Sequence, residues 1–188
     1  MKQIVKMVAV LTILGVISGL VLSLVSEYAQ PIIEANEQEA IEEAIYYVLP
    51  RTKDYETKTY NGKKIYSTVN EEGSLVGYAF TASGSGYQGT IKLMVGVDSN
   101  LEQIQGIQIL ESEETPGLGG KIRGEEFKTQ FRGLNLRPEP DKNLALVKTA
   151  PTSPGEVQAI TGATISSRTV VDTINKVLQE VRSYLQVD

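Results

Sequence analysis

One run of twenty residues near the N-terminus carries no charged side chain: residues 7–26, MVAVLTILGVISGLVLSLVS. A helix of this length is long enough to cross the hydrocarbon core of a bilayer, which is about 30 Å thick. A cleaved secretion signal is the alternative, but its apolar region is usually shorter, about 7–15 residues. In addition, Glu27 would occupy the third position before a cut after Ala29, where a small residue is needed. The run therefore predicts a helical membrane anchor.

The charges on either side of this run predict its orientation. Lys2 and Lys6 precede it, and Glu27 is the first charge that follows. Because basic residues are retained on the cytoplasmic side, the N-terminus is expected in the cytoplasm. The sequence thus predicts a single-pass protein of the cell (inner) membrane, with its folded part on the outer, extracytoplasmic side.

Two residue types are missing from the sequence, and their absence excludes several kinds of site. The 188 residues include no cysteine and no histidine. A chain without them has no disulfides, no thiolate nucleophile and no Ser-His-Asp triad, and it lacks the ligands on which most zinc sites depend. We identify no catalytic or metal-ligating residues in the sequence, and any redox chemistry must come from a cofactor.

The charge balance argues against nucleic acid as a partner. After residue 26 the chain has 16 basic and 23 acidic residues, a net charge of −7. Nucleic-acid binding depends on basic surfaces that neutralise phosphates, so this balance is unfavourable for it.

The rest of the sequence predicts an α+β fold. Apolar residues at helical spacing predict a helix over 32–49, which Pro50 ends, and a clear amphipathic helix over 166–185. Alternating segments between them predict a mostly antiparallel sheet with flanking helices. The expected strands are 63–69, 74–82, 90–97 and 101–110, with shorter ones at 144–147 and 156–160 and a short helix at 125–131. The expected organisation is an anchor over 1–26, a connecting helix over 27–50 and one domain over 51–188.

A small hydroxyl-containing motif, Thr161-Gly162-Ala163-Thr164, precedes the last predicted helix. Unpaired N–H groups at a helix start favour a phosphate, and threonine offers a hydroxyl that can be esterified. Ordinary helix capping by a threonine is the alternative reading of this motif.

Two glycine-rich segments are further candidates for a binding site. The first is ESEETPGLGGKI over 111–122, whose low side-chain bulk suits either a sharp turn or a flat ligand against the backbone. The second is SGSGYQG over 83–89, where Tyr87 is either the rim of a planar-ligand pocket or an aromatic residue at a strand end. The second segment lacks the strand–loop–helix context of a dinucleotide-binding fingerprint.

Taken together, these features resemble the FMN-binding domain family of the G subunit of the Rnf electron-transport complex. The C subunit of the sodium-translocating NADH:quinone reductase is related to it. The resemblance extends over nearly the whole chain: the anchor, the glycine–tyrosine segment before IKLMVGV, the ETPGLG loop and TGAT before a terminal helix. One difference is Gln158, six positions before Thr164, where the family often carries an acidic residue.

The resemblance implies a function and a cofactor. It implies an electron-carrier subunit of a membrane-bound, ion-translocating ferredoxin:NAD oxidoreductase, without a complete active site of its own. It also implies FMN attached through a phosphoester to Thr164 by a flavin transferase, and other Rnf subunits as membrane partners. The cofactor-binding residues it implies are Thr161, Gly162, Ala163, Thr164, Glu114, Thr115, Pro116, Gly117, Leu118, Gly119 and Tyr87.

Two other functions are compatible with the same residues. One is a standalone, membrane-anchored extracytoplasmic flavoprotein that serves another reductase. The other is a cofactor-free interaction module in which TGAT is only a helix cap. Flavin absorption that persists after denaturation distinguishes the flavoproteins from the cofactor-free module.

The predicted orientation can be tested with reporter fusions. Because Lys2 and Lys6 precede the uncharged run, a reporter fused to the C-terminus is expected on the outer side of the membrane. Fusion of the same reporter before residue 7 is the control and is expected in the cytoplasm. A C-terminal reporter active in the cytoplasm, with the other subunits present, would contradict the orientation.

Overall fold

The computed structural model describes residues 1–138 and 143–185. These residues belong to two compact units, one made of residues 1–40 and the other of residues from 41 onward. The described part of the chain contains one helix that is long and apolar enough to cross a membrane, and this helix includes residues 7–26.

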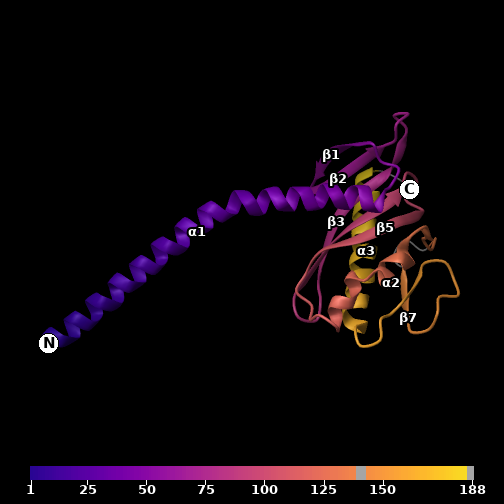
Figure 1. Cartoon of the computed structure of the whole chain (residues 1–188). Coiled ribbons are helices and arrows are strands. Elements are labelled where there is room, and N and C mark those ends of the chain that lie inside the picture. Colours follow the sequence, from indigo (N-terminus) through magenta and orange to yellow (C-terminus); the bar gives the residue numbers. More distant parts are fainter. Residues whose placement is uncertain (139–142, 186–188) are drawn as a thin grey trace. The chain divides into compact units, whose positions relative to one another are not determined.

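The first unit is part of a single helix, α1 (Lys2–Val48; Figure 1). It therefore joins the predicted anchor and the predicted helix 32–49 without a break, and Pro50 follows closely after its end. The large apolar side chains between Ile4 and Val25 are all exposed. An apolar surface of this extent is what a lipid-facing helix presents.

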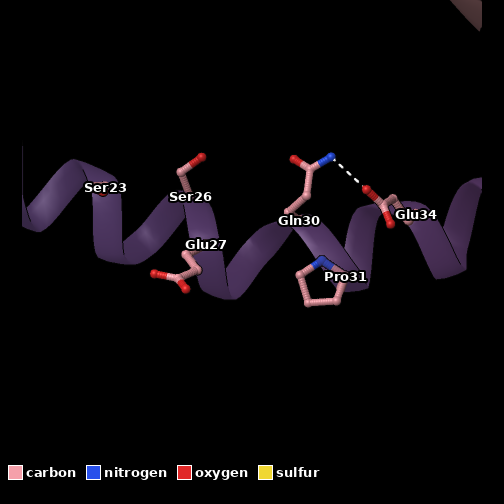
Figure 2. A pocket seen from close by; sticks show the side chains of 6 residues that line it. All are labelled: Ser23, Ser26, Glu27, Gln30, Pro31 and Glu34. Carbon is pink, nitrogen blue, oxygen red and sulfur yellow. Dashed lines mark hydrogen bonds between the residues drawn. The ribbon is translucent and has the colours of Figure 1, made fainter.

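Pro31 lies inside α1, a few residues after the uncharged run. Since proline has no backbone N–H, the carbonyl of Glu27 does not receive the usual helical hydrogen bond there. Next to it, Gln30 Nε2 donates a hydrogen bond to Glu34 Oε1 at 2.9 Å, which bridges one turn (Figure 2). The helix thus continues through the proline, and the acidic side chains begin where the uncharged run ends.

The second unit is built on a six-stranded antiparallel sheet in which each strand pairs with the next along the chain. Its strands are β1 (Asp54–Tyr60), β2 (Lys63–Val69), β3 (Leu75–Ser85), β4 (Thr90–Asp98), β5 (Gln103–Ser112) and β6 (Leu134–Asn135). The strands β7 (Ala145–Val147) and β8 (Glu156–Gln158) form a separate parallel pair. The remaining helical segments are η1 (Gly119–Arg123), α2 (Glu125–Lys128), η2 (Thr129–Phe131) and α3 (Thr164–Leu185). The α+β class, the mainly antiparallel sheet and its four predicted long strands are confirmed.

Strand β1 was not among the predicted strands because it lacks an alternating apolar pattern. It is an edge strand whose residues are exposed, apart from the partly buried Tyr55 and Tyr60. The turn that joins it to β2 is Asn61-Gly62, and both residues have positive φ, 46° and 77°. These angles are typical of a type I′ turn, which pairs two consecutive strands as a hairpin. The turn, rather than an apolar side-chain pattern, therefore positions β1 beside β2.

The sheet is covered on both faces, because successive side chains along a strand point to opposite faces and each face has its own apolar partners. Phe80 and Val95 point to one face, where they pack against Val170, Ile174 and the other apolar residues of α3. Their neighbours Ala79 and Met94 point to the opposite face. There they pack against the last turns of α1, including Ala44, Ile45 and Val48. The end of α1 is therefore part of the core of the second unit.

Two glycines that face each other across β4 and β5 make room for the end of α1. Gly96 pairs with Gly106, and Val48 lies directly over them. A Cβ at Gly96 would lie 2.7 Å from Val48 Cγ2 and 2.9 Å from Val48 O. A Cβ at Gly106 would lie 3.3 Å from Val48 Cα, a milder contact. The helix approaches this closely because neither strand carries a side chain there.

We predict that Gly96→Ala destabilises the protein although alanine normally suits a strand better than glycine. The added methyl group overpacks the contact with Val48, so the free energy of unfolding should fall by about 1–3 kcal/mol. Gly106→Ala is the matched comparison and should cost less. Urea unfolding of the full chain in detergent, followed by circular dichroism, measures both; equal stability of wild type and Gly96→Ala would contradict the close packing of α1 on these strands.

Candidate functional site

Three segments that are far apart in the sequence meet at one pocket of about 340 Å³. They are the turn after β3, the loop after β5 and the start of α3. The pocket is lined by Tyr87, Gln88, Glu114, Thr115, Leu118, Gly119, Gly162, Ala163, Thr164, Ile165 and Ser166. The structure thus brings together the three candidate segments that the sequence offered separately.

Most of the candidate residues line this pocket, but three do not. Thr161, Pro116 and Gly117 are exposed next to it and do not contribute to its wall. Gly117 instead has φ +80°, so glycine is needed there for the turn between Thr115 and Leu118. Sequence reasoning missed three lining residues, Gln88, Ile165 and Ser166, although each is adjacent to a predicted one or follows it closely.

The carboxylate of Glu114 connects the three segments. Its Oε1 accepts hydrogen bonds from the backbone N–H groups of Tyr87 at 2.7 Å and Gln88 at 3.0 Å. Its Oε2 accepts a hydrogen bond from Ser166 Oγ, in the first turn of α3, at 2.6 Å. Glu114 is only 7% exposed, so one buried side chain ties the loop that carries it to the other two walls.

Two glycines are required by this carboxylate. A Cβ at Gly86 would lie 2.3 Å from Glu114 Oε1, and a Cβ at Gly119 would lie 1.9 Å from Glu114 Oε2. Part of the glycine pattern in SGSGYQG and ETPGLGG therefore accommodates the buried acid. One expectation from the sequence was that the missing side chains make room for a flat ligand. At Gly119 the space that a side chain would fill is instead occupied by the Glu114 side chain.

Hydrogen bonding keeps Glu114 ionised in its buried position. Burial by itself acts to raise the pKa of Glu114. The hydrogen bonds from Ser166 and from the backbone N–H groups of Gln88, Tyr87 and Gly89 outweigh burial, so the pKa lies below its usual value. The pocket wall therefore contains a fixed negative charge at neutral pH.

The helix α3 begins at Thr164, two residues earlier than predicted. Ala163 occupies the capping position, because its carbonyl accepts the first helical hydrogen bond, from Ser167 N at 2.9 Å. Gly162 precedes it with φ +82°, a conformation that favours glycine. The Ala163 side chain is buried, whereas Thr164 is exposed.

This geometry can be compared with the alternative in which a threonine of TGAT only caps the helix. Within the described part of the chain, neither the Thr161 nor the Thr164 hydroxyl has a hydrogen-bond partner. The serine that stabilises this turn is Ser167, whose Oγ donates to Ala163 O at 2.9 Å and accepts from Ile160 N at 3.2 Å. The Thr164 hydroxyl is thus left accessible, and the N–H groups of the first turn have no carbonyl partner within the helix.

Contacts between α3 and the sheet fix the position of this helix start. Thr169 Oγ1 donates a hydrogen bond to Ser85 O at 3.0 Å, at the end of β3. Close by, a Cβ at Gly84 would lie 2.1 Å from Thr173 Oγ1, so the strand and helix are in tight contact there. The first turn of α3 is therefore held beside the Tyr87–Gln88 turn, which follows β3.

The pocket suits a flat, partly exposed ligand. Tyr87, Leu118 and Ile165 present large apolar groups that are 72%, 54% and 53% exposed. Glu114 is the one charged side chain among the lining residues. The volume lies at the lower end of the range of about 300–1,000 Å³ for small-molecule pockets. An anionic group is best placed at the helix start, where N–H groups converge, since no lysine or arginine is among the lining residues.

Gln158 lies outside the pocket. It ends β8, and its backbone N–H donates to Gln130 Oε1 at 2.7 Å while its carbonyl accepts from Gln130 Nε2 at 3.3 Å. The position that differs from the family pattern therefore has a role in joining β8 to η2.

A second hollow lies along α1 and has a different character. It is lined by Ser23, Ser26, Glu27, Gln30, Pro31 and Glu34 (Figure 2). All six residues belong to one helix, so no second element closes the hollow. This makes it a poor candidate for a small-molecule site.

The chain is similar to several known proteins. The family model described as "FMN-binding domain" matches residues 86–179, a range that includes every pocket-lining residue. The G subunit of the ion-translocating oxidoreductase complex of Methanosarcina acetivorans is 32% identical over 190 residues, covering 96% of this chain and 95% of the relative. The G subunit of the Na(+)-translocating ferredoxin:NAD(+) oxidoreductase complex of Acetobacterium woodii is 31% identical, covering 95% and 91%.

Solved structures show the same fold. The C subunit of the Na(+)-translocating NADH-quinone reductase from Parabacteroides distasonis is 28% identical, with a TM-score of 0.57. The match covers 65% of this chain and 62% of that one. NqrC of Shewanella oneidensis also has a TM-score of 0.57, at 18% identity, with 73% and 74% covered, and supports the fold alone.

The hydrogen bonds of Glu114 predict a pH-dependent contribution to stability. Because the pKa of Glu114 is lowered in the folded state, its ionised form stabilises the fold at pH values above the unfolded pKa of about 4.5. This stabilisation is lost as the pH falls through the pKa of the folded state. Glu114→Gln should therefore lower the free energy of unfolding by about 1–3 kcal/mol near pH 7. The difference from wild type should shrink as the pH falls below 4.5. Thermal unfolding at a series of pH values measures this; a difference that stays constant with pH would contradict it.

Proposed function

The chain belongs to the family of Rnf-complex G subunits, which contain an FMN-binding domain, and on this premise we propose that it carries electrons through an FMN attached covalently to Thr164. FMN supplies the redox chemistry by accepting and donating electrons. The protein holds the cofactor, orients it and sets its surroundings. The proposed role is that of an electron-carrier subunit of a ferredoxin:NAD oxidoreductase.

The observation that carries this proposal is the accessible Thr164 hydroxyl at the edge of the pocket. It has no hydrogen-bond partner within the described residues, and it lies on the first residue of α3. A phosphodiester at this position keeps one negative charge, which a helix N-terminus stabilises by about 0.3–1 kcal/mol in an exposed setting. That stabilisation is too small to retain FMN, so retention depends on the covalent bond.

A flavin transferase would attach the cofactor in an exchange that balances. Thr164 Oγ forms a bond to the phosphorus of the FMN half of FAD, and its proton is released. The bond between the two phosphates of FAD breaks, and AMP leaves. Ala163 and Gly162 favour this step because neither has a bulky side chain that would shield the hydroxyl.

The remaining lining residues would hold the ring. Tyr87, Leu118 and Ile165 offer apolar surface for its faces, and Thr115 and Gln88 lie at the edge, joined by a hydrogen bond from Thr115 Oγ1 to Gln88 Oε1. The pocket therefore combines apolar contact for the ring with an acceptor for the phosphate.

The proposed setting is the outer face of the cell membrane, next to other Rnf subunits. Support comes from the uncharged run in α1 and from the names of the relatives, which are subunits of ion-translocating complexes. A tether is useful there, because a dissociated cofactor outside the cytoplasm would be lost by dilution.

We predict that Thr164→Ala abolishes covalent FMN. The substitution removes the oxygen that forms the ester and keeps a residue that suits the helix. Wild type made together with a flavin transferase should gain the mass of one FMN group on the peptide that contains Thr164, and Thr164→Ala should show no gain.

Thr161→Ala is the matched control, because Thr161 lies in the same motif but outside the pocket. It should retain FMN and at most acquire it more slowly. Peptide mass spectrometry distinguishes the variants, and circular dichroism checks that each is folded. FMN on another residue, or on Thr164→Ala protein, would overturn the assignment.

A further inference from the structure

We propose that Glu114 is a positioning residue whose carboxylate holds the helix turn that bears Thr164 in place and lowers the midpoint potential of the attached flavin. The inference rests on the proposed attachment to Thr164 and goes beyond it. It assigns to one buried acid both the geometry of the attachment site and part of its redox tuning.

The positioning role follows from the hydrogen bonds of the carboxylate. Ser166, which donates to Glu114 Oε2 at 2.6 Å, lies two residues after Thr164 in the first turn of α3. The other oxygen is bound by the N–H groups of Tyr87 and Gln88 in the turn after β3. The carboxylate therefore determines how far the turn that carries Thr164 lies from the turn that carries Tyr87.

The close packing around Glu114 limits its alternative conformations. The two carboxylate oxygens lie so close to the backbones of Gly86 and Gly119 that neither residue could carry a Cβ. Ser166 and Glu114 are both buried, at 2% and 7% exposure. A carboxylate that is enclosed in this way has a fixed position. The geometry it imposes is preorganised, as a site for covalent attachment requires.

The redox role follows from the charge of the carboxylate. Glu114 is the one charged side chain among the lining residues, and it is buried, so solvent screens its field weakly. Reduction adds negative charge to a flavin, and a fixed negative charge next to it makes that addition less favourable. Loss of this charge should therefore raise the midpoint potential.

Two variants separate the geometry from the charge. Glu114→Gln removes the charge but keeps an amide of similar shape, whose oxygen can accept from the backbone and whose NH₂ group can donate to Ser166 Oγ. Ser166→Ala removes one hydrogen bond and keeps the charge. Glu113→Gln is the matched control, because Glu113 precedes Glu114 and binds Thr90 N at 3.2 Å but does not line the pocket.

The experiment uses the full chain in detergent with a flavin transferase and FAD. Intact mass followed over time gives the rate of FMN incorporation, and spectroelectrochemical titration gives the midpoint potential of the attached flavin. Ser166→Ala should incorporate FMN at least about tenfold more slowly than wild type, since misplaced reacting groups lose rate steeply. Glu114→Gln should shift the midpoint potential to a higher value. Glu113→Gln should match wild type in both measurements.

The outcomes distinguish this inference from the proposed function. Wild-type protein without FMN on Thr164 would overturn the attachment itself. Wild-type protein that carries FMN on Thr164, together with Ser166→Ala protein that acquires it at the wild-type rate, would overturn the positioning role alone. An unchanged midpoint potential in Glu114→Gln would also overturn the proposal. If Glu114→Gln fails to fold, as circular dichroism would show, the Ser166→Ala rate decides.

Discussion

The packing of α3 against one face of the sheet is the interaction on which the site depends. The apolar stripe of this helix, which includes Val170, Ile174 and Val181, lies on the inward residues of the central strands. At about 25 cal/mol per Å² of buried apolar surface, a contact of this kind is a main source of domain stability. It also sets the approximate position of the helix on the sheet. The end of α1 buries the opposite face, so neither side of the sheet is left uncovered.

Within that frame, a few polar contacts give the pocket its finer geometry. Apolar packing tolerates small shifts, whereas hydrogen bonds to a buried carboxylate have strict distances and directions. Glu114 supplies such contacts to two segments, and Thr169 adds one between α3 and the end of β3. Each part of the protein thus depends on a different kind of interaction. The apolar part of α1 presents a lipid-compatible surface, the sheet is packed on both faces, and a small buried polar network holds the site.

The sequence predicted most of the fold, and the reasons for its successes and failures are local. Strands β2 to β5 were recognisable because they carry apolar residues toward one or both covered faces, and β4 is buried along most of its length. Helix α3 has an apolar stripe because it covers one face of the sheet. Strand β1 was missed because an exposed edge strand has no such pattern, although Asn61-Gly62 marks its turn. Each loop of the site was recognisable as a sequence motif. That the loops lie close together was predicted only from the family resemblance, since no local sequence pattern indicates a contact between Glu114 and Ser166. The reason for Gly119 was also out of reach, because it depends on where the Glu114 carboxylate lies in the folded protein.

The order of the site segments along the chain has a consequence for biogenesis. Strands β1 to β5 pair with their sequence neighbours, so each hairpin closes over a short loop and has low contact order. The pocket also needs residues 162–166, which follow β5 by about fifty positions. It cannot form until α3 has been made and packs on the sheet. An enzyme that recognises the complete pocket would therefore act only on molecules in which α3 is already packed on the sheet.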